Sequence, residues 1–98
     1  MKRTKLIYIL GRNKNELLAY DEYDSEGSGK WFTDSPMMAE EYNCKRACEE
    51  AEKEKLDVYM WEITYDTIEK RIIKEETWLQ FTYEEAMEWK NNHFKTEF

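Results

Sequence analysis

The sequence VYMWEITY, residues 58–65, is the clearest fold signal in this chain. Aromatic and β-branched residues dominate it and it lacks Gly and Pro, so it has the strongest strand pattern in the sequence. Side chains alternate across a strand, and both faces of this one therefore carry bulky groups. One face holds Tyr59, Trp61, Ile63 and Tyr65, and the other holds Val58, Met60, Glu62 and Thr64.

Three further strands are predicted toward the N-terminus. Residues 6–10 (LIYIL) have the pattern of a buried strand, and residues 16–23 alternate as its hairpin partner across the polar turn 11–15. Residues 24–29 (DSEGSG) have loop composition, and residues 30–33 (KWFT) form a short strand after it.

A helical region is expected next. Asp34-Ser35-Pro36 is a helix-start signal, with Ser or Asp as the cap and Pro in the first turn. Residues 37–42 form either the start of one long helix or a short turn that is recapped at Asn43. In the second case a helix runs from Cys44 to about Lys55, with its apolar stripe on Ala47, Cys48, Ala51 and Leu56.

The last third of the chain predicts a hairpin and a terminal helix. Asp66-Thr67 is the expected turn from the strand 58–65 into a partner strand over residues 68–74. Thr82-Tyr83-Glu84-Glu85 matches a capping box, in which Glu85 reaches back to the backbone N–H of Thr82. A helix from Tyr83 to about His93 should follow.

The order of elements is therefore β-β-(β)-α-β-β-α, which predicts an α+β fold. Strands joined by hairpins form a small antiparallel sheet, with one or two helices packed on one face. At 98 residues, the chain is expected to form a single domain, residues 1–98. No apolar stretch approaches the roughly 18 residues that a membrane-spanning helix needs, and we expect a cytoplasmic protein without a membrane partner.

Charge is unevenly distributed along the chain. Residues 1–15 carry five basic groups and no acid, residues 16–69 carry sixteen acids and five bases, and residues 70–98 carry six acids and five bases. The net charge is −7. Such a field repels nucleic acid and membrane surfaces and attracts basic protein surfaces.

No catalytic, cofactor or metal motif accompanies the acids. Cys44 and Cys48 share one face of a predicted helix, where geometry disfavours a disulfide, and we expect free buried thiols. His93 is the single histidine, and its expected role is a favourable charge at the end of the last helix. A small-ligand or enzymatic use of these three residues remains an alternative. Asp21, Glu22, Asp24, Glu26 and Asp34 lack the spacing of a calcium loop.

Aromatic residues make up 15% of the chain, more than a core of this size requires. The surplus favours an interface, because Trp and Tyr are enriched where proteins meet. A self-assembling structural or accessory phage protein is therefore one alternative, with a homo-oligomer face led by Trp61 and Tyr59. Stacking on single-stranded nucleic acid would need a basic groove, which the overall charge opposes.

The layout of residues 5–65 resembles that of some type II anti-CRISPR proteins of Gram-positive phages and prophages. The resemblance rests on the strand Lys5–Leu10, a second strand ending in tyrosine, and Trp31-Phe32-Thr33-Asp34 leading into an Ala-containing turn and a Glu/Lys helix. It implies a cytoplasmic, non-enzymatic anti-defence inhibitor without a cofactor. Its partner would be a basic host protein such as a CRISPR-associated or other defence nuclease.

An acidic surface suits such a partner, because carboxylates can occupy a Lys/Arg-lined channel where phosphates would otherwise lie. The alternative is that the acids only keep a small protein soluble. The reserve candidates are Glu49, Glu50, Glu52 and Glu54 on the predicted helix. The first candidates for partner binding are Asp21, Glu22, Asp24, Glu26, Asp34, Glu40 and Glu41.

Overall fold

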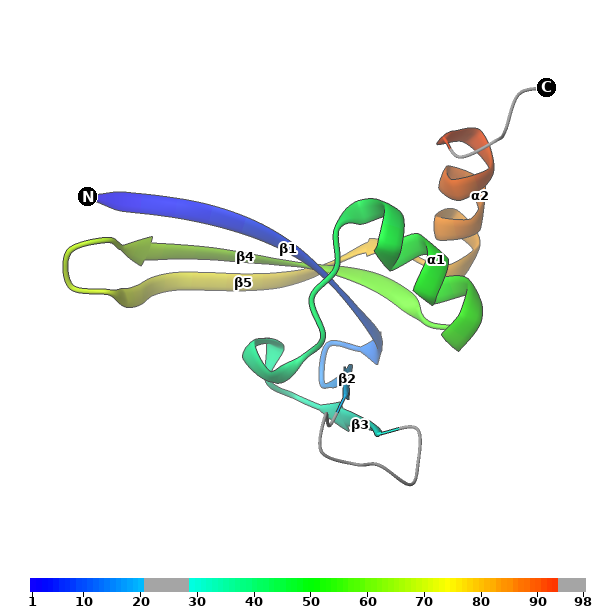
Figure 1. The fold of residues 1–98 in the computed structure, drawn as a ribbon, viewed down its shortest axis with the longest axis horizontal. Helices are drawn as coiled ribbons and strands as arrows, with labels where there is room; N and C mark the ends of the chain where they lie inside the picture. Colours follow the sequence, from blue (N-terminus) through cyan, green and yellow to red (C-terminus); the bar gives the residue numbers. More distant parts are fainter. Residues whose placement is uncertain (21–28, 94–98) are drawn as a thin grey trace.

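The computed structural model describes residues 1–20 and 29–93. It has an α+β fold, as predicted: five antiparallel strands in the order β3-β2-β1-β4-β5, with two α-helices packed at one end of the sheet (Figure 1). The strands are β1 (Lys2–Asn13), β2 (Glu16–Tyr20), β3 (Lys30–Thr33), β4 (Asp57–Asp66) and β5 (Arg71–Phe81). The helices are α1 (Cys44–Glu54), α2 (Tyr83–His93) and a short 3₁₀ helix, η1 (Pro36–Met38).

The two central strands, β1 and β4, form the longest ladder, with Ile7 opposite Trp61 and Ile9 opposite Tyr59. Their side chains contribute to two apolar clusters. One is the helix-side cluster, in which strand residues meet α1 and α2: Leu10, Leu18, Ala47, Cys48, Ala51, Leu56, Val58 and Ala86. The other comprises Ile7, Ile9, Leu17, Ala39, Tyr59, Trp61 and Ile63.

This second cluster buries two aromatic residues of β4, Tyr59 and Trp61. Tyr59 is 6% exposed and Trp61 is 3% exposed, so both lie inside the chain. The sequence-based expectation that these two residues lead an exposed homo-oligomer face is therefore wrong. The physical reason is that both side chains pack in this cluster, against residues of the neighbouring strands and Ala39 from the segment before α1 (residues 34–43).

That segment also joins β1 to β2 where the two strands diverge. The Glu40 N–H donates to the carbonyl of Leu18 in β2, and Tyr42 exchanges two backbone hydrogen bonds with Tyr8 in β1. These hydrogen bonds satisfy backbone groups of both strands, and they hold the backbone of Glu40 and Glu41 in place.

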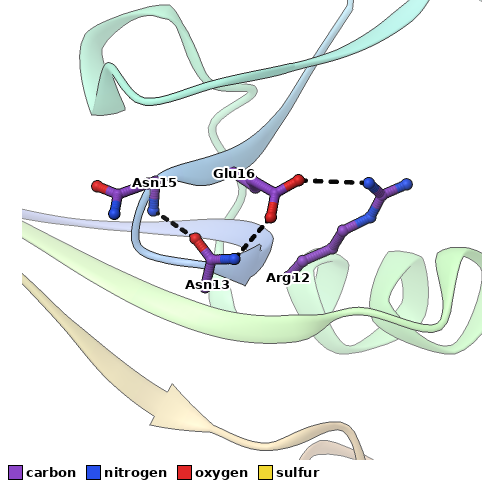
Figure 2. A network of polar contacts seen from close by, with 4 residues as sticks. All are labelled: Arg12, Asn13, Asn15 and Glu16. Carbon is purple, nitrogen blue, oxygen red and sulfur yellow. Dashed lines mark hydrogen bonds and ion pairs between the residues drawn. The ribbon is translucent and has the colours of Figure 1, made fainter.

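The β1–β2 turn is tied by polar contacts (Figure 2). Glu16 accepts hydrogen bonds from Asn13 at 2.7 Å and from Arg12 at 3.4 Å, and the Asn15 N–H donates to Asn13 Oδ1 at 2.8 Å. The register shifts between Gly11 and Asn13, so the hairpin carries an irregularity at this point.

Helix boundaries follow the capping residues. Of the two alternatives for residues 37–55, the structure shows a separate short turn and a helix recapped at Asn43, whose side chain accepts a hydrogen bond from the Arg46 N–H. The capping box of α2 is present: Glu85 accepts from the Thr82 N–H, and the Thr82 hydroxyl accepts from the Glu85 N–H. Asp57 adds an acceptor for the Tyr83 N–H.

The second hairpin differs from the prediction. β5 begins at Arg71 and not at residue 68, and it continues to Phe81. The cause of the late start is Asp66, whose carboxylate accepts the N–H groups of Ile68 and Glu69 and so holds residues 67–70 in a turn. The hairpin and the start of β1 extend away from the helices (Figure 1).

Candidate binding surface

Three of the predicted partner-binding acids lie on the segment before α1, residues 34–43, which connects β3 to α1. Asp34, Glu40 and Glu41 are all exposed, and we call them the acidic rim. Within residues 1–20 and 29–93 they have no ion pair and no side-chain hydrogen bond. Their backbone is nevertheless held firmly, because Ala39 is 6% exposed in the core and Glu40 is bonded to β2.

The other four predicted acids, Asp21, Glu22, Asp24 and Glu26, lie outside the described residues. Their relation to the acidic rim therefore stays a prediction from the sequence.

The reserve acids on α1 are mostly engaged within the chain. Glu54 pairs with Lys30 at 2.7 Å, Glu52 pairs with Lys90 at 2.6 Å, and Glu50 pairs with Arg46 at 3.0 Å. The hydrogen bond and charge of Lys90 lower the pKa of Glu52. These carboxylates already have cationic partners, so they are poorer candidates for binding a basic surface than the acidic rim.

A cavity of about 580 Å³ lies next to the acidic rim, and sequence reasoning missed it. It forms between η1, the β1–β4 ladder and the β4–β5 turn, with Trp61 and Ile63 among its apolar walls. The register Lys5–Ile63 and Ile7–Trp61 brings these residues together from distant parts of the chain. The lining residues are Lys5, Ile7, Met37, Glu41, Trp61, Ile63, Tyr65, Asp66, Thr67, Lys70, Arg71 and Ile72.

The Trp61 side chain contains a buried polar atom without a partner. Its Nε1 has no hydrogen-bond acceptor in the described part of the chain, and no other buried side-chain nitrogen or oxygen there is unsatisfied. An unpaired buried donor typically costs about 1–3 kcal/mol. The same cluster that buries Trp61 therefore carries a local energetic defect beside the cavity.

Two exposed apolar residues lie between Asp34 and Glu40 in the sequence. Met37 is 61% exposed and Met38 is 57% exposed, although both are large apolar residues. Methionine adapts its shape to many surfaces, and exposed methionines are common at binding sites. Exposed acidic and apolar side chains therefore follow one another along residues 34–41.

The candidate nucleophiles do not lie at this surface. Cys48 is fully buried in the helix-side cluster, and burial raises the pKa of its thiol to about 12. Both Cys44 and Cys48 are free thiols. His93 lies at the end of α2, where its ring stacks on Trp89 at 4.3 Å and its Nδ1 is 2.9 Å from the Trp89 carbonyl. Among the described residues, no three His, Cys, Asp or Glu side chains gather as a metal site.

Comparisons with known proteins leave the family of this chain open. No family model matches it, and neither a curated protein nor a solved structure does. In the ranges 1–20 and 29–93, no helix has the length and apolar character needed to cross a membrane.

Proposed function

We propose that this chain is a non-catalytic binding protein that blocks a basic, nucleic-acid-handling partner through its acidic rim. In the setting that the anti-CRISPR resemblance implies, the partner is a CRISPR-associated or other defence nuclease. The chain itself does not contact nucleic acid in this proposal, and its role is that of an inhibitor.

The observation that carries the proposal is the contrast between two groups of acids. Glu50, Glu52 and Glu54 of α1 are each paired with a cation of the same chain. In the described part of the chain the acidic rim lacks such partners, although Lys and Arg are plentiful. Unpaired carboxylates on an anchored backbone can bind a cationic surface without first breaking an internal ion pair.

Electrostatics favours the proposal on two grounds. A net charge of −7 accelerates the encounter with a basic surface, and this acceleration falls as salt rises. Carboxylates also accept bidentate hydrogen bonds from Arg, as phosphates do. Met37 and Met38 add apolar contacts beside the charges, which electrostatic steering alone does not supply.

Charge reversal of the rim tests the proposal. The variant Glu40→Lys/Glu41→Lys changes two exposed rim residues, and the control Glu84→Lys/Glu88→Lys makes the same charge change on the exposed face of α2. The assay is the association rate with a purified, guide-loaded type II CRISPR effector at low and high salt. We expect the rim variant to associate about tenfold more slowly and the control about as fast as the unmodified chain.

Circular dichroism of each variant shows whether it is folded before binding is compared. Equal slowing by both variants would mean that only total charge matters, and the rim would lose its special role. No association of the unmodified chain at low salt would remove this nuclease class as the partner.

A further inference from the structure

Among residues 1–20 and 29–93, no strand pairs with the outer side of β5. Strand β5 is the last strand in the order β3-β2-β1-β4-β5, and it is 11 residues long. Residues 71–76 are exposed, because this part of the hairpin extends beyond the helices (Figure 1). A strand edge of this length presents a row of free N–H and C=O groups to any complementary strand.

Charged side chains are ordered along this edge. Lys70 precedes the strand in the turn, Arg71 and Lys74 lie at its beginning, and Glu75 and Glu76 follow directly. An antiparallel copy of the same strand would set the basic half against the acidic half on both sides of a two-fold axis. A parallel copy in register would set like charges opposite each other, which is unfavourable.

Arg71 pairs with Glu69 of the preceding turn, but the other charges of this edge are not neutralised within the described part of the chain. Glu76 lies directly opposite Glu62 on β4, a like-charge pair that destabilises a sheet, and Glu75 lies opposite Ile63. In the described part of the chain, neither Lys74 nor these glutamates form an ion pair. A cation supplied from outside the chain next to Glu76 would relieve its repulsion with Glu62.

We propose that β5 pairs with β5 of a second copy of this chain, antiparallel about a two-fold axis. The sheets of the two copies then form one continuous ten-stranded sheet, counting five strands from each copy. The closed two-fold arrangement uses the same edge twice and leaves no free β5 for further growth.

A second copy fits this edge better than an arbitrary strand. Lys74 and a bulge at Ile73, which has no partner residue on β4, both discourage indiscriminate strand addition. The order of charges restricts pairing to a strand with the complementary order, and β5 itself has that order when it runs antiparallel. Ile72 is 38% exposed and Leu79 is 43% exposed, and pairing would cover part of these apolar side chains.

A charge-swap experiment tests the dimer. One variant, Arg71→Glu/Lys74→Glu, makes the edge acidic, and the other, Glu75→Lys/Glu76→Lys, makes it basic. The assay is sedimentation equilibrium at low salt over about 5 to 200 µM, a range suited to a weak dimer. For the unmodified chain we expect the mass to rise with concentration toward twice the 12.0 kDa of one copy.

Each variant alone should dimerise at least about tenfold more weakly, because like charges then face each other on the paired edges. An equimolar mixture should regain dimers, which native mass spectrometry identifies as heterodimers by their intermediate mass. The control Glu84→Lys/Glu88→Lys should dimerise like the unmodified chain. Circular dichroism of every variant separates lost pairing from lost folding.

A mass of 12.0 kDa for the unmodified chain throughout this range would overturn the proposal. Dimers of unchanged strength in both edge variants would also overturn it, and so would a mixture that stays monomeric. These outcomes leave the acidic rim untouched, because the rim and β5 share no residue.

Discussion

Gly11 offers a sharp test of the irregular β1–β2 hairpin, because a side chain there has no room. A Cβ at this position would lie 2.8 Å from the Glu16 carbonyl oxygen, 2.9 Å from Leu17 Cδ2 and 3.1 Å from the Asn13 carbonyl oxygen. Two of these three atoms belong to the backbone and cannot rotate away. Leu17 is fully buried, so its side chain cannot move toward solvent either.

The expected cost of Gly11→Ala follows from these contacts. Overpacking in a filled core costs about 1–3 kcal/mol, while the loss of glycine entropy in the unfolded chain returns about 0.4–1 kcal/mol. The net destabilisation is about 1–2 kcal/mol, which for a domain of this size lowers Tm by roughly 5–15 °C.

Thermal unfolding followed by circular dichroism measures the effect, with Lys14→Ala as a control in the same turn. Lys14 is exposed, so the control should change stability by less than about 0.5 kcal/mol. A Gly11→Ala variant as stable as the control would refute the close approach of β1 and β2 at this residue.

Three further predictions concern a cap, a thiol and a carboxylate. Asn43→Ala removes the side-chain acceptor at the start of α1 and should cost about 1 kcal/mol in the free energy of unfolding, measured by urea titration. Cys48 should resist iodoacetamide at pH 8 in the folded protein and react in denaturant, because it is buried and its pKa is raised to about 12; rapid native labelling at this residue by mass spectrometry would contradict the burial. Hydrogen bonds from the backbone N–H groups of Glu69 and Ile68 lower the pKa of Asp66 in the folded state. A lowered folded-state pKa stabilises the protein above the unfolded-state pKa of about 4, and this stabilisation is lost as pH falls through the folded-state value. Urea unfolding below pH 4 should therefore show a steeper loss for the unmodified chain than for Asp66→Asn, and equal slopes would argue against the turn.

Local patterns predicted most of the secondary structure. The alternation over 58–65, the cap at Asn43 and the capping box at Thr82 each act over a few residues, and the structure contains all three. The extent of β5 was not predictable in this way, because the carboxylate of Asp66 delays its start and pairing with β4 carries it on to Phe81.

The candidate site depended on contacts that no local pattern encodes. The burial of Tyr59 and Trp61 results from the path of the segment before α1, which the sequence left undecided between two arrangements. The acidic rim differs from the acids of α1 in having no ion pair within the described residues, and ion pairs between distant residues cannot be predicted from a local pattern. Glu52 pairs with Lys90, which is 38 residues away in the sequence.

If the acidic rim occupies the surface where the partner holds nucleic acid, this chain and DNA must compete for the partner. The most direct measurement is a competition between this chain and a target DNA duplex for a guide-loaded type II CRISPR effector, followed by fluorescence anisotropy of labelled DNA. We expect the chain to displace the DNA, and the Glu40→Lys/Glu41→Lys variant to need about tenfold more protein for the same displacement. Simultaneous binding of the chain and the DNA to one effector would contradict the proposed function.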